Sequence, residues 1–129
     1  RCVASGVDMF DCALPTRIAR NGALFTRLGR IDIASAIYKD SVNSVDDECD
    51  CYACSNFTLG YLNHLFKAKE LLGLRLASIH NLRFVTRLMA DVREAIMLGT
   101  FEQFALEFLS SYQTANEEAR LEQRRKLSR

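Results

Sequence analysis

The chain has 129 residues, of which 49% are hydrophobic and 26% charged, and this is ordinary for one globular domain with a core. Its formal net charge of +1 gives no global field that would attract nucleic acid. Arg75 and Arg83 interrupt the longest apolar stretches, so we expect no membrane span, and no secretory signal peptide is recognisable. These features favour a cytoplasmic protein.

Charges of opposite sign are segregated along the first half of the chain. The region from residue 12 to residue 31 has no acidic residue but contains four arginines: Arg17, Arg20, Arg27 and Arg30. The region from 40 to 50 carries five acids: Asp40, Asp46, Asp47, Glu48 and Asp50. Such segregation marks either a local anion-binding edge or two solvated loops.

The N-terminal residues predict a helix end followed by one strand. Residues 1–5 end a helix that Gly6 closes, and residues 7–14 form a short apolar run before Pro15. The run is apolar on both faces, which is typical of a buried strand in a parallel sheet. No second such strand is present, so we expect the chain to be a fragment whose partner strands lie in missing sequence.

The next segment predicts a loop and a small hairpin. We expect a loop over residues 15–22, then strands at 23–26 and 30–33 joined around Gly29. The segment from 34 to 50 is polar and irregular.

Three helices are predicted in the second half. The first spans residues 56–72, with Ser55 as N-cap and Gly73 as its end; the second runs from Ser78 to Gly99. The third opens with a capping-box pattern at 100–103. The expected core stripe of the second helix is Leu82, Val85, Leu88, Met89, Val92 and Ile96, and that of the third is Phe101, Phe104, Phe108, Leu109 and Tyr112. Beyond Ala115 the polar sequence predicts a solvated helix or a frayed tail.

Three cysteines within six positions predict a metal site. Cys49, Cys51 and Cys54, with His80 as a fourth ligand, form the donor set of a closed tetrahedral zinc site. His64 is the alternative fourth ligand, but His80 stands at a predicted helix start from which its ring can turn toward the cysteines. An odd total of five cysteines argues against a disulfide framework. The competing interpretations are a chance cluster and a redox-active one, although a filled tetrahedral site would suppress thiol reactivity.

Two motifs occur together in one order. The first is Gly6-Val-Asp-Met-Phe-Asp-Cys12-Ala-Leu-Pro-Thr-Arg17-x-x-Arg20-Asn-Gly22, and the second is Cys-x-Cys-x2-Cys-x25-His. With the stretch Tyr61-Leu-Asn-His-Leu-Phe66, they strongly resemble the carboxy-terminal part of bacterial tRNA-guanine transglycosylase. The resemblance runs from about Gly6 to Tyr112, and its spacing selects His80 over His64.

The resemblance implies a (β/α)8 TIM barrel with a zinc subdomain inserted after the last strand. Residues 1–34 would supply the last strand, the catalytic and RNA-binding loop and the hairpin, 35–80 the zinc subdomain, and 81–129 the carboxy-terminal helices. The family exchanges guanine at the wobble position of tRNAs with GUN anticodons for 7-aminomethyl-7-deazaguanine. The purine pocket and the acid/base partner lie outside this chain, so we expect no turnover from the chain alone.

The family motif places the nucleophile at Asp11, where a carboxylate can form a covalent intermediate with tRNA. Residues alone favour a different role for Asp11, in which it caps a turn before Pro15, and Asp8 is taken as structural. The same resemblance assigns RNA contacts to the loop after the nucleophile, Thr16, Arg17, Ile18, Ala19 and Arg20. Ile18 and Ala19 would contribute backbone only, and a solvated loop is the alternative.

The predicted first helix carries a second stripe of Phe57, Tyr61, His64, Ala68 and Leu71. It predicts either a further core contact or a subunit interface, because the bacterial family resembles a homodimer built partly from this subdomain. Cys2 and Cys12 are not expected to bind metal, and Cys12 is expected in the core. The alternative function is a non-catalytic, zinc-stapled module for tRNA docking or dimerisation, against which the presence of Asp11 argues.

Overall fold

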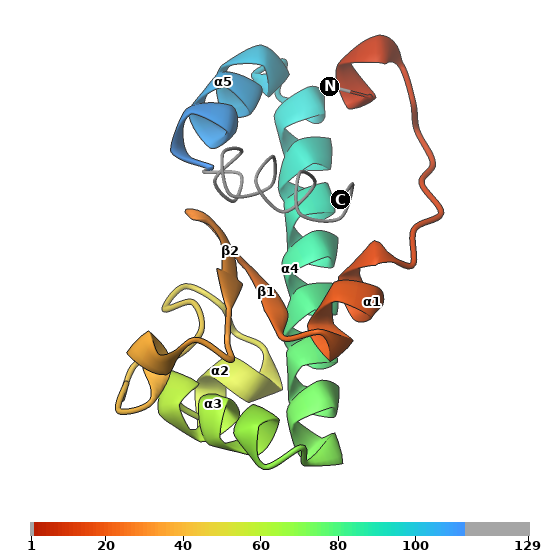
Figure 1. The fold of residues 1–129 in the computed structure, drawn as a ribbon. Coiled ribbons are helices and arrows are strands. Elements are labelled where there is room, and N and C mark those ends of the chain that lie inside the picture. Colours follow the sequence, from red (N-terminus) through yellow and green to blue (C-terminus); the bar gives the residue numbers. More distant parts are fainter. Residues whose placement is uncertain (1, 113–129) are drawn as a thin grey trace, which may run out of the picture.

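One long helix, α4, forms the spine of the computed structural model, which describes residues 2–112 (Figure 1). The hairpin, α1, α2 and α3 lie around one half of this helix, and α5 lies at its other end. In chain order the elements are a 3-10 turn at Val3–Ser5, α1 at Leu14–Arg20, β1 at Ala23–Thr26, β2 at Gly29–Asp32, a 3-10 turn at Ala36–Tyr38, α2 at Tyr52–Asn56, α3 at Leu59–Lys67, α4 at Leu71–Met97 and α5 at Phe101–Ser111.

The strand expected over residues 7–14 is not formed. Residues 7–13 are irregular and exposed, and Met9 keeps 87% of its surface accessible. A strand requires a neighbouring strand for its backbone hydrogen bonds, and no described residue pairs with this segment. Gly6 does adopt the expected left-handed conformation, with φ at 85°, and closes the first turn.

The loop expected over residues 15–22 is wrong, because a helix, α1, begins at Leu14. Pro15 stands in its first turn, where the missing N–H would have no helical partner anyway and the fixed φ suits a helix. Pro15 and Ala19 are the buried residues of α1 and face α4.

The predicted hairpin is confirmed to within one residue. β1 and β2 pair antiparallel, with Leu24 opposite Ile31. The outer edge of β1 is satisfied by Asn81 of α4, which is fully buried. Its side chain accepts a hydrogen bond from the Phe25 N–H (3.0 Å) and donates to the Ala23 carbonyl (2.9 Å) and to the Pro15 carbonyl (3.0 Å). One amide therefore joins α1, the hairpin and α4.

The predicted helix boundaries between residues 52 and 78 are wrong. The cap of α3 is Thr58 rather than Ser55, and its hydroxyl accepts a hydrogen bond from the Tyr61 N–H. The chain turns at Lys69, whose φ is 59°, so α4 begins at Leu71 and not at Ser78. Gly73 lies inside α4, where a Cβ would come within 3.0 Å of the Leu65 side chain. It permits the close approach of α3 and α4 rather than ending a helix.

The second half of α4 and all of α5 are less buried than their apolar stripes predicted. None of the six expected core residues on α4 is buried, and Leu82 and Ile96 are about half exposed. The same holds for the five on α5, of which Leu109 is exposed. Phe104, Phe108 and Tyr112 instead stack in series along α5. Thr100 precedes α5 as expected but caps nothing, since its hydroxyl donates to the Ala95 carbonyl.

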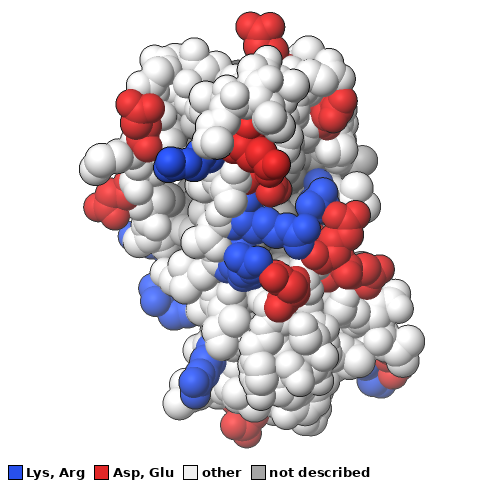
Figure 2. All heavy atoms as spheres, turned by 180° about the vertical axis from the view of Figure 1, so that it is seen from behind, with Lys and Arg blue, Asp and Glu red and all other residues white. Residues whose placement is uncertain are grey.

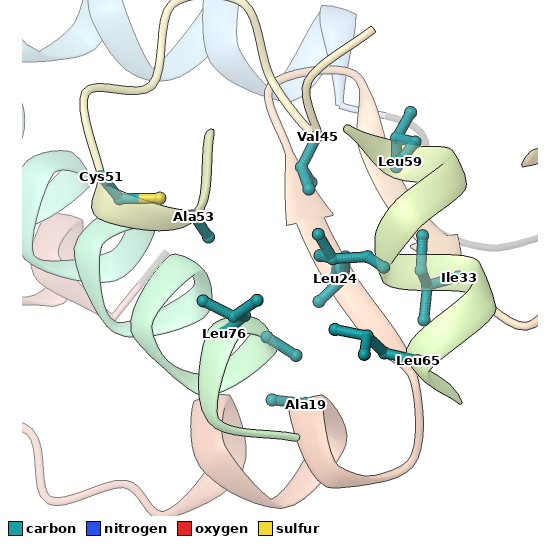
Figure 3. Close-up of a cluster of buried hydrophobic side chains, with 11 residues drawn as sticks. Ala19, Leu24, Ile33, Val45, Cys51, Ala53, Leu59, Leu65 and Leu76 are labelled. Carbon is teal, nitrogen blue, oxygen red and sulfur yellow. The ribbon is translucent and has the colours of Figure 1, made fainter. Parts of the chain in front are cut away.

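The buried core sits between the hairpin, α2, α3 and the first half of α4. Figure 3 shows Leu24 of β1, Leu65 of α3 and Leu76 of α4 pointing into one shared space. The full cluster is Ala19, Leu24, Ile33, Val45, Cys51, Ala53, Leu59, Leu62, Leu65, Leu76 and Ala77. The expected boundary between the zinc subdomain and the carboxy-terminal helices, at residues 80 and 81, falls inside α4. The core packs against one side of this helix.

None of the described helices is both long and apolar enough to cross a membrane. The expectation for the polar segment after Ala115 lies outside the described residues.

Asn81→Ala should lower the free energy of unfolding by about 2–4 kcal/mol, because it leaves three buried backbone groups without their partner. Urea titration of the zinc-loaded protein measures this change. Asn43→Ala is the matched control, since Asn43 is exposed and its side chain makes no hydrogen bond within residues 2–112. A loss below about 1 kcal/mol for Asn81→Ala would contradict the assignment.

Candidate metal centre

The three cysteines reach the cluster from one loop and the start of one short helix. Cys51 is the N-cap of α2, and its sulfur accepts a hydrogen bond from the Cys54 N–H at 3.4 Å. This turn places Cys54 next to Cys51, while Cys49 arrives from the preceding loop, where its own N–H donates to the Asp46 carbonyl. The close spacing of the cysteines is therefore converted into one compact knuckle.

The fourth donor comes from the middle of α4. His80 is fully buried, and its Nδ1 lies 3.7 Å from the sulfur of Cys49, 3.7 Å from that of Cys51 and 3.3 Å from that of Cys54. All four ligand atoms lie within 4.8 Å of one another. In a regular zinc tetrahedron, sulfur and nitrogen stand about 3.6 Å apart, given metal–ligand bonds of about 2.3 and 2.05 Å. The observed distances fit this geometry.

The second ring nitrogen of His80 has its own partner. Nε2 lies 2.7 Å from the Phe25 carbonyl of β1, so it carries the proton and donates, which leaves the Nδ1 lone pair for a metal. Metal-binding histidines usually show this arrangement, because it fixes both the tautomer and the ring orientation. The hairpin thus orients the fourth ligand.

When no metal is bound, the three thiols do not share negative charge equally. A hydrogen bond from Cys54 holds the pKa of Cys51 well below its ordinary value. The same bond with Cys51, and then burial, raises the pKa of Cys54, and burial raises the pKa of Cys49. A metal ion must therefore displace protons from Cys49 and Cys54, and its affinity increases with pH.

The structure decides between the two candidate histidines. His80 belongs to the cluster, whereas His64 is exposed on α3 and belongs to no such group among the described residues. The sequence predicted His80 at a helix start. It lies instead inside α4, which begins nine residues earlier at Leu71. Cys12 is exposed rather than in the core, and so is Cys2; neither lies in the cluster.

The residues predicted for catalysis and RNA binding do not belong to this cluster. They precede the cysteines in the chain and lie in an irregular segment and on α1. Asp11 is exposed in the irregular segment and makes no hydrogen bond or ion pair within the described range. Thr16 to Arg20 lie on α1; Arg17 and Arg20 are exposed, Thr16 and Ile18 half-buried and Ala19 buried. Nothing in residues 2–112 joins Asp11 and these arginines into one site.

Sequence reasoning missed the residues that support the ligands. Asn81 and the Phe25 carbonyl hold the hairpin against α4, and Arg83 and Arg87 contact the loop that carries Cys49. Arg83 follows His80 by three residues, the spacing of one helix face. That spacing is visible in the sequence, but the acidic partners are not adjacent to it.

Comparison with known proteins gives consistent matches. Residues 1–114 match the family model for queuine tRNA-ribosyltransferase. Over 124 residues, 96% of this chain, the sequence is 50% identical to a queuine tRNA-ribosyltransferase of Dehalococcoides mccartyi strain CBDB1. Identity is 52% over 90% of the chain with the protein of that name from Caldanaerobacter subterraneus subsp. tengcongensis, and 55% over 82% with that from Tolumonas auensis.

The chain belongs to the queuine tRNA-ribosyltransferase family. It spans about a third of the length of these curated relatives, which it covers to 32%, 31% and 28%. Membership of the family implies a TIM-barrel enzyme, and the part described here is mostly helical with one two-stranded hairpin. The Cys49, Cys51, Cys54 and His80 cluster is suited to one structural zinc ion, since four protein ligands leave no open position for chemistry.

In this family member, His80→Ala should abolish stoichiometric zinc, because it removes one of the four ligands and leaves the Phe25 carbonyl without its donor. His64→Ala should retain one zinc per chain. Atomic emission spectroscopy after gel filtration measures the metal content of both variants. Zinc lost from His64→Ala but kept by His80→Ala would contradict the ligand assignment.

Proposed function

We propose that this chain is the carboxy-terminal part of a tRNA-guanine transglycosylase, which exchanges guanine at the wobble position of tRNA for a 7-deazaguanine. The observation that carries the proposal is identity of about 50% with curated queuine tRNA-ribosyltransferases across nearly the whole chain. The substrates are tRNAs with GUN anticodons and 7-aminomethyl-7-deazaguanine. The exchange is a step in queuosine biosynthesis. Zinc would have no chemical role beyond holding residues 35–80 on α4.

We assign residues 7–13 to the last strand of a barrel in the whole enzyme. Two features of the structure support this. Met9 and Phe10 are apolar and exposed, at 87% and 50%, and the backbone of the segment has no ladder partner among residues 2–112. Neighbouring barrel strands would cover the side chains and supply the hydrogen bonds. Residues 1–34 would then form the catalytic end of the barrel, and α4 and α5 would pack against it.

Asp11 would serve as the nucleophile. In the first displacement its carboxylate attacks C1′ of the wobble guanosine, the bond from C1′ to N9 breaks, and guanine departs with that electron pair and takes a proton from an acid outside this chain. In the second, N9 of the incoming deazaguanine gives its proton to the conjugate base of that acid and attacks C1′, and the bond to Asp11 breaks with its electron pair returning to the carboxylate. Exposure of Asp11 directly before α1 supports the role, because a buried carboxylate could not reach an extruded nucleotide.

The exposed face of α1 would contact RNA. Arg17 and Arg20 are one turn apart and both exposed, while the opposite face of α1 packs on α4 through Pro15 and Ala19. Two guanidinium groups at this spacing suit two phosphates or a phosphate and a base edge. Ala19 can contribute only through the stability of this helix, and Thr16 and Ile18 lie at its half-buried margin.

We infer that Phe57, Tyr61 and His64 of the second stripe form a homodimer interface. The alternative of a further core contact is met by Phe57, which is half-buried against the core, whereas Tyr61, His64 and Leu71 are exposed. The rings of Phe57 and Tyr61 stack at 5.3 Å, and Tyr52 lies edge-on to Phe57 at 5.7 Å. Stacked, partly exposed aromatic rings are characteristic of the central residues of interfaces.

Asp11→Asn in the whole enzyme should reduce base exchange by on the order of 10³-fold or more, because the amide cannot form the glycosyl ester. Incorporation of radiolabelled guanine into tRNA measures the exchange, and a denaturing gel detects the covalent adduct. Asp8→Asn is the matched control and should keep activity within about threefold of wild type. An adduct that persists in Asp11→Asn would refute the assignment of the nucleophile.

Tyr61→Glu should convert the whole enzyme from dimer to monomer, because an ionised carboxylate would be buried without a partner at the proposed interface. Sedimentation velocity at several protein concentrations measures the change. Leu28→Glu, which alters an exposed apolar residue in the hairpin turn, should leave the dimer intact. Equal behaviour of the two variants would remove the support for this interface.

A further inference from the structure

Three arginines from two elements converge on the acidic segment, residues 46–50, which carries Cys49 and precedes Cys51. Arg83 of α4 forms a two-pronged ion pair with Asp50, with both N–O distances at 2.7 Å. Arg87, one turn further along α4, donates a hydrogen bond to the Glu48 carbonyl. Two residues of the acidic segment, Glu48 and Asp50, are therefore held by α4.

The third arginine comes from the hairpin turn. The side chain of Arg27 pairs with the Glu48 carboxylate at 3.0 Å, and its backbone N–H donates to the Asp46 carboxylate at 3.1 Å. The acidic segment is thus fixed from two sides, by the hairpin and by α4. Figure 2 shows the same pattern on the surface, where basic side chains gather at the middle of one face with acidic ones beside them.

The arginines of α4 share a face with the metal ligand of that helix. His80, Arg83 and Arg87 stand at spacings of three and four residues, which place them in one row along the helix. The row meets the acidic segment in order, with His80 against the three sulfurs, Arg83 against Asp50 and Arg87 against Glu48. One helix face therefore positions both the fourth metal ligand and the backbone that carries two of the others.

We propose that Arg83 and Arg87 are positioning residues for the metal centre, which dock the acidic segment on α4 and so slow the loss of zinc. Release of zinc from a closed site requires a thiolate to swing away from the ion. Cys49 and Cys51 flank Asp50, so neither can move far while Asp50 is held by both of its oxygens. The proposal concerns metal retention only and holds or fails independently of base exchange.

Electrostatics add to this restraint. A zinc ion with three thiolates and one neutral imidazole has a net charge of −1, and the acidic segment adds four carboxylates beside it. Without opposite charges, these groups would repel one another and favour an open loop. Arg83 binds both carboxylate oxygens of Asp50, which places a positive charge directly beside these negative groups.

The same contacts decide the role of the acidic segment and of Arg27. The sequence left open whether the charge segregation marks an anion-binding edge or solvated loops. Arg27 is already paired with Glu48. Of the four arginines between residues 12 and 31, Arg27 meets the acidic segment in the fold, and Arg83 and Arg87 bind that segment from α4.

The test measures zinc transfer from the loaded protein to an excess of chromogenic chelator under pseudo-first-order conditions. Arg83→Ala and Asp50→Asn should each release zinc about tenfold faster than wild type. The double variant should release it no more than about twofold faster than either single variant, because both changes break one pair. In 1 M NaCl the gap between wild type and the single variants should narrow, since the pair is exposed and screened.

Arg93→Ala is the matched control, because Arg93 is exposed on the same helix and forms no ion pair with the residues described here. It should release zinc within about twofold of wild type. Arg87→Ala serves as a second probe and should also accelerate release, whereas its effect should persist in high salt because its acceptor is a neutral carbonyl. Release rates of Arg83→Ala and Asp50→Asn within twofold of wild type, or effects that multiply in the double variant, would overturn the proposal.

Discussion

The rest of this structure depends on the contacts that the two ring nitrogens of one buried imidazole make. His80 presents Nδ1 to three sulfurs and donates from Nε2 to the Phe25 carbonyl, so a single ring connects α4, the cysteine knuckle and the hairpin. Asn81, the next residue, satisfies the N–H of the same Phe25 and two carbonyls more. Neighbouring residues on a helix point in different directions, and here both directions are filled by backbone groups that would otherwise be buried without partners.

This arrangement explains how the irregular loop at residues 34–50 is kept in place. Residues 34–50 contain one 3-10 turn and no strand, and a loop of that length has little intrinsic order. Zinc ligands, arginine pairs and the small core beneath them supply the restraints that regular hydrogen bonding does not. A closed set of four ligands is inert, so the chemistry of the proposed enzyme must lie elsewhere, and we propose the exposed Asp11 for it.

Apolar side chains are unevenly buried along α4 and in the segment where a strand was expected. The first half of α4 has α3, the hairpin and α1 packed on it and contains buried Leu76, Ala77, His80 and Asn81, whereas its second half carries exposed apolar side chains such as Ile96 and Met97. The large apolar side chains of residues 7–13, Val7, Met9 and Phe10, are uncovered as well. Under the proposed function both surfaces would meet barrel strands and helices from the other two thirds of the enzyme.

The sequence by itself determined the three sulfur ligands of the metal centre and the hairpin, whereas the structure decided for His80 over His64. Clustered cysteines close a knuckle by local geometry, and a two-strand turn around Gly29 involves only neighbouring residues. Prediction from the sequence failed at Pro15 and Gly73. A proline in the first turn of a helix resembles one that prevents a helix, and a glycine inside a helix resembles one that ends it. Only the tertiary structure decided those cases. The helix α1 is held by its packing on α4. Gly73 is needed because a Cβ at this position would lie 3.0 Å from the side chain of Leu65 on α3. The tertiary structure also decided that the acidic segment binds Arg27, Arg83 and Arg87, since partners 19 to 39 residues apart are joined by the fold and not by any local pattern.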